Sequence, residues 1–132
     1  MTPGEAIRLH NAAYERREAG AFLEALADGA LYEMPLLRSR MVGRAEIAEG
    51  LRLAFAATQG CAMALARLRE SGGTALAEGH MTARLAREET TAEIPFAMVA
   101  AVNGDRIARL SVYLDARPFR LWADGPVMAI GR

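Results

Sequence analysis

Few side chains in this sequence have both a type and a position suited to acid–base chemistry. The first is His10, which shares the apolar arc of the first predicted helix with Tyr14, one helical turn further on. A neutral imidazole there could act as a general base near pH 7, with Tyr14 beside it. The alternative is a structural histidine whose ring N–H donates to a backbone carbonyl or a water.

The second candidate is His80, which lies in a predicted strand. A period of two places His80 on one face with Glu78, Thr82 and Arg84. The other face then carries an apolar series: Ala77, Gly79, Met81, Ala83 and Leu85. An apolar series is normally the core side, and this argument places His80 outside.

Composition excludes several kinds of chemistry. All 16 basic residues are Arg, and the absence of Lys excludes Schiff-base catalysis and a phosphate-loop lysine. A net charge of zero provides no field that would attract nucleic acid or an anionic membrane. Cys61 has apolar neighbours and is expected to be an inert thiol in a reducing compartment. Because His10, His80, Glu78 and Asp115 lack the close spacings of metal ligands, we expect no metal site and no cofactor.

Nothing in the sequence suggests a secreted or membrane protein. The N-terminus lacks the basic and apolar regions of a signal peptide, and the longest uncharged run, Leu53 to Ala66, falls short of a membrane span. We therefore expect one soluble, cytoplasmic domain covering residues 1–132, with neither a membrane nor a nucleic acid as partner.

The first half of the chain has helical patterns. Thr2-Pro3-Gly4-Glu5 is a capping box, and the helix it starts is predicted to run to Ala19 and stop at Gly20. The elements predicted next are a helix from Ala21 to Ala27, a strand from Ala30 to Met34, a loop from Pro35 to Gly43 and a helix from Arg44 to Thr58.

From Cys61 onward the pattern changes to a period of two. A first strand ends at Ser71-Gly72-Gly73, and three long strands follow, with hairpin turns near Arg87–Thr90 and at Asn103-Gly104-Asp105: Thr74 to about Glu88, Thr91 to Val102 and Asp105 to Asp115. Helices followed by strands predict an α+β fold, in which three N-terminal helices pack on a strongly curved antiparallel sheet. Helices packed on a sheet curved in this way form a cone, which has a packed closed end and an open mouth that can hold a small molecule.

Three passages resemble the nuclear transport factor 2-like superfamily, in its SnoaL-like and ketosteroid-isomerase-like branch. The passage from Ala30 to Arg52 is similar to the family's strand, proline loop, glycine and third helix. The passage from Gly104 to Phe119 is similar to its final strand with Tyr-x-Asp and a nearby Pro. The first helix, with Ala19-Gly20 at its end, fits as well.

The resemblance implies that this protein has the fold and pocket of the steroid isomerases but lacks the two carboxyl groups that those enzymes use. Met34 stands where those enzymes have an Asp base, and Ala97 stands where they have a protonated Asp. Counting against the isomerases also places His80, Thr82 and Arg84 inside the pocket, which contradicts the alternation argument and leaves both alternatives open.

The role of Asp115 is open between two interpretations as well. Related cyclases place an acid on their last strands, but Ala108, Leu110, Val112 and Leu114 form the apolar face of this strand, so Asp115 would point the other way unless a bulge changes the parity.

Arg38 and Arg40 lie on the loop expected at the mouth of the cone. They would either contact the ligand or simply be solvated. Seven residues are expected to form the core or pocket wall: Met34, Leu36, Phe55, Ala97, Val99, Leu110 and Val112.

We therefore expect a homodimer that binds a small apolar or carbonyl-containing molecule. As an enzyme it would be a cofactor-free isomerase, cyclase or dehydratase acting by proton transfer, with His10, Tyr14, His80 and Asp115 as candidate catalytic residues. The alternative is a non-catalytic ligand-binding or dimerisation module of the same fold.

Overall fold

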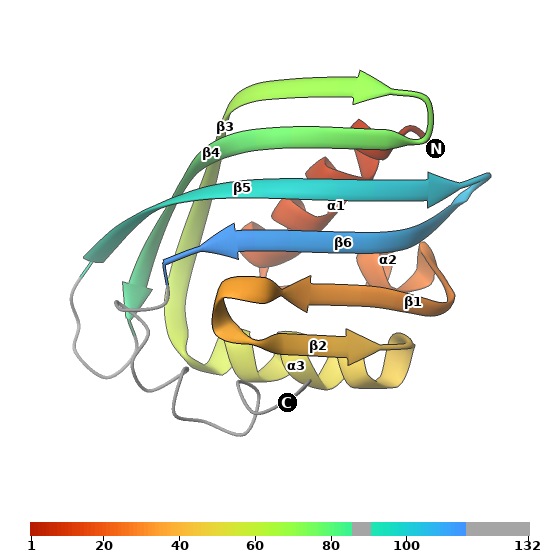
Figure 1. Ribbon diagram of the computed structural model, residues 1–132. Helices are drawn as coiled ribbons and strands as arrows, with labels where there is room; N and C mark the ends of the chain where they lie inside the picture. Colours follow the sequence, from red (N-terminus) through yellow and green to blue (C-terminus); the bar gives the residue numbers. More distant parts are fainter. Residues whose placement is uncertain (86–90, 116–132) are drawn as a thin grey trace.

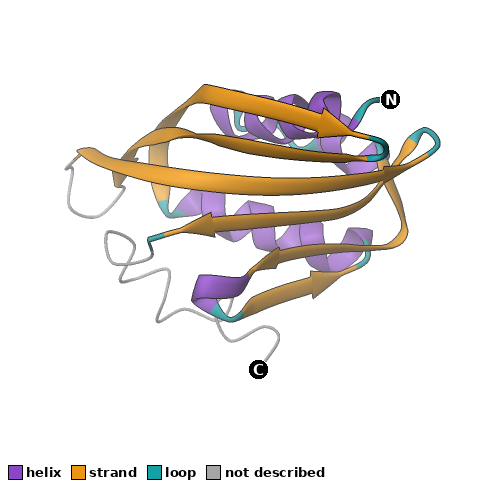
Figure 2. Ribbon diagram, turned by 45° about the horizontal axis from the view of Figure 1, so that its top comes forward, coloured by secondary structure: helices purple, strands orange, loops and turns teal. Residues whose placement is uncertain are grey.

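The computed structural model describes residues 1–85 and 91–115, and these form an α+β domain with three α-helices and a curved, open sheet of six strands. All three helices lie on one face of the sheet (Figures 1 and 2). The hairpin turn predicted near Arg87–Thr90 and the residues after Asp115 lie outside the described residues.

Helix α1 (Pro3–Arg16) begins as predicted and ends early. The Thr2 hydroxyl accepts a hydrogen bond from the Glu5 backbone N–H, and the Glu5 carboxylate accepts one from the Thr2 backbone N–H. The predicted end near Gly20 is wrong, because Arg17 adopts the left-handed conformation at φ 57°. The Arg17 guanidinium donates to the carbonyls of Phe55 and Thr58, and these distant contacts fix the end of the helix.

The other helices are also shorter than predicted. Helix α2 spans only Gly20–Glu24, because strand β1 (Leu26–Met34) already begins at Leu26. The predicted loop contains the 3₁₀ turn η1 (Pro35–Leu37) and the short strand β2 (Ser39–Val42). Helix α3 (Arg44–Ala56) ends before Thr58, where strand β3 (Thr58–Ser71) begins.

The remaining strands are β4 (Thr74–Leu85), β5 (Thr91–Asn103) and β6 (Arg106–Leu114), and the order across the sheet is β2-β1-β6-β5-β4-β3. Four of the five pairings are antiparallel, but β1 and β6 run parallel, with Tyr32 opposite Leu110. The prediction of a purely antiparallel sheet is therefore wrong at this pair. The predicted turn at Asn103-Gly104-Asp105 is confirmed, with Gly104 at φ 62°.

The sheet bends where its long strands carry irregularities. Strand β3 shifts register between Thr58 and Gly60 and again between Leu65 and Arg67, and such bulges increase local bending and twist. Gly79 of β4 lies where the backbone of β3 approaches closely, because a Cβ at this position would stand 2.1 Å from the Ala64 carbonyl oxygen. Larger residues are therefore excluded from the point where β4 curves past β3.

The two faces of the sheet differ sharply in burial. Along β4 the odd-numbered residues from Ala75 to Leu85 are buried under the helices, and the even-numbered residues are exposed on the opposite, outer face. The helix-facing side of the other strands continues this core with Tyr32, Met98 and Leu110. Across residues 1–85 and 91–115, no helix has both the length and the apolar character needed to cross a membrane.

Candidate functional site

A chain of four polar side chains crosses the core between α1 and β1. His10 and Tyr14 project from one side of α1, and Tyr32 projects from the helix-facing side of β1. The Tyr32 hydroxyl lies 2.8 Å from Nε2 of His10 and 3.0 Å from the Tyr14 hydroxyl. On the other side of the ring, Nδ1 of His10 lies 2.9 Å from Oδ1 of Asn11.

The chemistry of the groups gives this chain a direction. The Asn11 amide oxygen can only accept, so Nδ1 of His10 carries the ring proton and donates it. Nε2 is then an acceptor, and the Tyr32 hydroxyl donates to it. The Tyr32 oxygen in turn accepts from the Tyr14 hydroxyl, so the donors run from Tyr14 through Tyr32 to His10 and on to Asn11.

Burial keeps the side chains of this hydrogen-bonded chain neutral. Removal from water lowers the pKa of His10 to about 4, against which the Asn11 hydrogen bond acts only in part. Burial likewise raises the pKa of Tyr14 and Tyr32 well above the ordinary value of a phenol. Near pH 7, Nε2 is therefore a free base that accepts a hydrogen bond, and both tyrosines keep their protons.

Tyr14 is the outer end of the chain. Its side chain is 8% exposed, against 2% for His10 and 1% for Tyr32. The half-buried Phe55 packs edge-on against Tyr14 at 5.5 Å, and Phe22 packs edge-on against His10 at the same separation. Of His10, Tyr14 and Tyr32, Tyr14 is therefore the nearest to solvent.

Cys61 and several of the predicted core residues lie on the helix-facing side of the sheet, as the His10 chain does. Burial and the nearby Glu15 raise the pKa of the Cys61 thiol to about 11, which makes it a poor nucleophile at neutral pH, in line with the predicted inert thiol. Met34, Leu110 and Val112 are buried in the core. They line the inner side of the strands that carry or neighbour Tyr32.

Three other residues predicted for the core or pocket wall lie away from the His10 chain, and two of them, Leu36 and Ala97, line a groove at the end of the sheet. Ala97 and Val99 alternate with buried residues on the outer face of β5, and Leu36 in η1 is 66% exposed. The reason is strand parity, because Met98 and Ala100 occupy the inner positions of β5.

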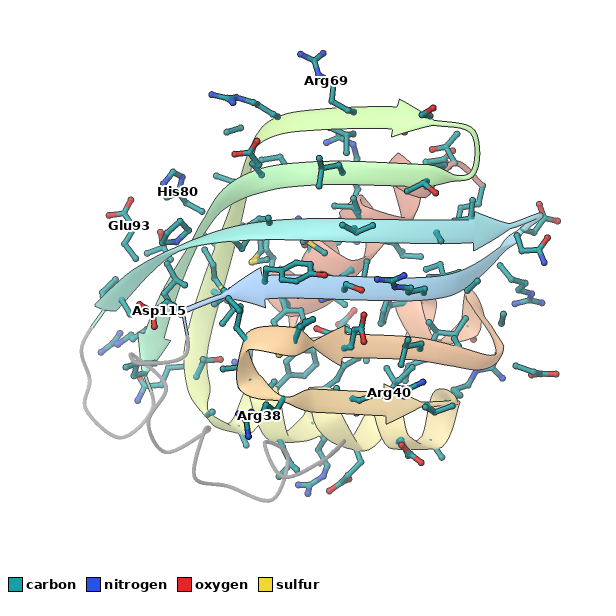
Figure 3. The ribbon with its side chains drawn as sticks, viewed as in Figure 1. Arg38, Arg40, Arg69, His80, Glu93 and Asp115 are labelled. Atoms are coloured by element: carbon teal, nitrogen blue, oxygen red, sulfur yellow. The ribbon has the colours of Figure 1, made fainter. Side chains whose placement is uncertain are left out.

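His80 also lies on the outer face, and the alternation argument is the one that describes β4. Glu78, two residues earlier, faces the same side and lies 3.7 Å from Arg67 of β3. Figure 3 shows His80 and Glu93 projecting from the curved end of the sheet, well away from α1. His80 therefore cannot join the His10 chain within one copy of the protein.

Asp115 lines an open groove at the end of the sheet, beside η1. The groove has a volume of about 580 Å³ and is lined by Leu36, Pro95, Phe96, Ala97, Tyr113, Leu114 and Asp115. Tyr113 lies on the side of β6 opposite its buried apolar residues, and Asp115 follows directly after the strand. Arg38 and Arg40 are both exposed, Arg38 directly after η1 and Arg40 in β2 (Figure 3).

The outer face also carries a charged cluster, formed by Glu33, Ser111 and Arg109. The Ser111 hydroxyl accepts from Nε of Arg109 at 3.0 Å and donates to the Glu33 carboxylate at 2.8 Å. Glu33 and the Arg109 guanidinium also lie 3.3 Å apart. Within the described part of the chain, no three His, Cys, Asp or Glu side chains are grouped as metal ligands would be.

The sequence interpretation missed Tyr32 and Asn11. Tyr32 could have been found, because Ala30, Tyr32 and Met34 form the inward series of β1 at a period of two. Asn11 carries no comparable signal, since an Asn beside a helical His is usually solvated on the surface.

Comparison with known proteins places the chain in a family. The family model described as a SnoaL-like domain matches residues 7–110. The chain belongs to the SnoaL-like family. No curated protein matches it.

Solved structures share the fold of this SnoaL-like protein. One is a hypothetical protein with a ketosteroid isomerase-like fold from Catenulispora acidiphila, in complex with trimethylamine; identity is 17%, coverage 96% and 97% of the two chains, and TM-score 0.80. A second is a putative SnoaL-like polyketide cyclase from Shewanella denitrificans, with 9% identity, 92% and 96% coverage and a TM-score of 0.79. A third, TerC co-crystallised with polyporic acid, has 18% identity, 92% and 97% coverage and a TM-score of 0.74. At these identities the likeness establishes a nuclear transport factor 2-like, ketosteroid isomerase-like fold.

Proposed function

We propose that this SnoaL-like protein binds a neutral, apolar carbonyl compound and catalyses proton transfer on it without a cofactor, as an isomerase, cyclase or dehydratase. The observation that carries the proposal is the buried chain from Tyr14 to His10. A putative SnoaL-like polyketide cyclase and a protein co-crystallised with polyporic acid are among the structural neighbours, and both support a small organic ligand.

The direction of the chain supplies a route for a proton. Tyr14 takes a proton from the carbon next to the carbonyl as it gives its own to Tyr32, and Tyr32 gives its proton to Nε2 of His10. The substrate becomes an enolate, His10 becomes an imidazolium, and Asn11 accepts a hydrogen bond from the cation at Nδ1. Return of the proton to another carbon completes an isomerisation. Because burial opposes charge on His10, the imidazolium is short-lived.

The ligand should carry no net charge. In the described residues, the buried polar side chains are His10, Asn11, Ser39 and Ser111, and none is charged near pH 7. An anionic or cationic group would lose its hydration without gaining an opposite charge, which is costly in a protein interior.

Proton exchange tests the activity without knowledge of the natural substrate. Acetophenone and 2-tetralone are neutral ketones whose α-protons are replaced by deuterium in D₂O, which proton NMR follows. We expect the protein to accelerate the exchange, and His10→Ala and Tyr14→Phe each to lower the acceleration, His10→Ala by about 10²–10⁴-fold. Tyr113→Phe, on the outer face, is the matched control. Binding of the ketones without exchange would favour the alternative, a ligand-binding module.

We further propose that the outer face of the sheet pairs two copies into a homodimer. Leu76 and Val42 are 49% and 45% exposed on this face, and Val99 lies half-buried between their strands. Exposed apolar side chains on a broad sheet favour burial against a second copy. We expect Leu76→Glu to produce monomers in sedimentation experiments, whereas Ala45→Glu on the exposed side of α3 should leave the dimer intact. A wild-type monomer at tens of micromolar, roughly the range of ordinary assays, would contradict this proposal.

A further inference from the structure

The amide of Asn11 is only half satisfied. Its side chain is 5% exposed, and its oxygen accepts from His10, but its nitrogen has no hydrogen-bond partner within residues 1–85 and 91–115. A buried amide nitrogen without a partner is costly, and such a group calls for a specific explanation.

Turning this amide by half a rotation reverses the whole chain. The Asn11 nitrogen would then donate to Nδ1 of His10, and the ring proton would reside on Nε2. Nε2–H would donate to Tyr32, Tyr32 to Tyr14, and the Tyr14 O–H would point outward. Each arrangement has three internal hydrogen bonds and leaves one Asn11 amide atom without a partner, so neither is favoured by the number of bonds.

The two arrangements hold the same number of protons and the same charge. The change moves the ring proton from Nδ1 to Nε2 and reorients the amide and two hydroxyls. In the observed arrangement Tyr14 offers an outward lone pair, which suits a proton-donating partner. In the reversed arrangement Tyr14 offers an O–H donor, which suits a carbonyl or enolate oxygen.

We propose that Asn11 is the positioning residue of this site, and that the orientation of its amide sets which nitrogen of His10 carries the proton and hence whether Tyr14 presents an acceptor or a donor to the ligand. The inference rests on the proposed function in one respect, that the ligand meets Tyr14. It explains how one hydroxyl could serve both the removal of a proton and the binding of the carbonyl oxygen.

Nitrogen-15 NMR of the histidine-labelled full chain tests the role of Asn11 without a ligand. Imidazole nitrogen shifts distinguish the two tautomers, and His80 on the outer face serves as an internal reference. We expect the Nδ1–H form for His10 in the wild type and in Asn11→Asp, whose carboxylate can only accept. Asn11→Leu should shift His10 to the Nε2–H form, because Nδ1 then has no acceptor. Asn103→Asp, the same substitution in an exposed turn, should change nothing.

Two results would overturn the role of Asn11: the Nδ1–H form in Asn11→Leu, or the Nε2–H form in Asn11→Asp. The Nε2–H form in the ligand-free wild type would contradict the reversal on binding, because the ring would already carry its proton on Nε2. Asn11→Asp alone decides the question if Asn11→Leu does not fold. Acetophenone then tests the reversal. When the wild type is saturated with acetophenone, the His10 ring proton should move from Nδ1 to Nε2. Asn11→Asp should bind acetophenone about tenfold more weakly than the wild type, which is the equivalent of one hydrogen bond.

The two proposals fail in different ways. If Tyr14→Phe weakens acetophenone binding but the wild-type ring keeps its Nδ1 proton, the reversal is wrong and the site stands. If acetophenone binds equally well to Tyr14→Phe, the proposed site is wrong, while the ligand-free spectra still decide whether Asn11 sets the tautomer.

Discussion

Two consecutive residues of β1, Tyr32 and Glu33, anchor two polar clusters on opposite faces of the sheet. On the helix-facing side, Tyr32 joins neutral groups that are almost fully buried. On the outer side, Glu33 joins Ser111 and Arg109, and the side chains of Glu33 and Arg109 are 21% and 47% exposed.

The difference shows how solvent decides what a polar cluster can do. Glu33 and Arg109 lie partly in water and share Ser111 as a second partner, and an exposed ion pair of this kind contributes little to stability. The His10 cluster is buried and neutral, so its hydrogen bonds join neutral donors and acceptors and a proton can pass along them. Three predictions sharpen this comparison.

The largest expected effect is the pH dependence of stability that His10 confers. The pKa of His10 is about 4 in the folded protein and 6.5 in the unfolded chain, taken as the ordinary value. Between these two pH values the unfolded chain therefore binds more protons than the folded protein. Stability from this group is fully present above pH 6.5 and is lost as the pH falls toward 4, by about 3 kcal/mol. Urea unfolding at pH 7 and pH 4.5 measures the loss, which should be smaller in His10→Gln than in His80→Gln. Equal losses in the two variants would contradict a buried neutral His10.

The second expected effect is the cost of Tyr32→Phe. Removal of this hydroxyl leaves Nε2 of His10 and the Tyr14 O–H without their partner, and an unsatisfied buried group costs about 1–3 kcal/mol. Tyr113→Phe removes a hydroxyl from the outer groove and should change the free energy of unfolding far less. Similar values for both variants would show that the inner chain has no special energetic role.

The smallest expected effect is that of Glu33→Gln. The amide can still accept from Ser111, so only the attraction to Arg109 is lost, and we expect less than about 1 kcal/mol. The loss should shrink further between 50 mM and 1 M NaCl, roughly the range over which salt screens such pairs, whereas the Tyr32→Phe loss should not respond to salt. A salt-insensitive Glu33→Gln would indicate a buried ion pair and would weaken the contrast between the faces.

Local patterns in the sequence were enough for much of the fold. The capping box at Thr2 and Glu5 and the turn at Gly104 depend on neighbouring residues, and each is found where it was predicted. The alternation of β4 is also local, and of the two alternatives left open for this strand it is the one that the structure agrees with. The end of α1 and the parallel pairing of β1 with β6 were not predictable in this way. Both depend on contacts distant in sequence, such as the Arg17 guanidinium on the Phe55 carbonyl.

The site was predictable only in part. The helical spacing of His10 and Tyr14 placed them on one buried arc, and the structure places them in one hydrogen-bonded chain through Tyr32. His80 and Asp115 depended on which face of a strand turns inward, where resemblance and alternation disagreed. Asn11 could not be recognised, because its part in the chain depends on the orientation of the His10 ring and not on any spacing.

The parallel pairing of β1 with β6 has a consequence for the order in which the protein folds. Glu33 and Ser111 are 78 residues apart in the chain, so this pairing closes a large loop and carries a correspondingly large entropic cost. During synthesis, β1 can pair with β2 at once, but its other edge must wait for β6, while β3, β4 and β5 can pair with their neighbours in succession. The edge of β1 that will receive β6 therefore stays open until β6 has left the ribosome, and in that interval it can pair with the wrong strand.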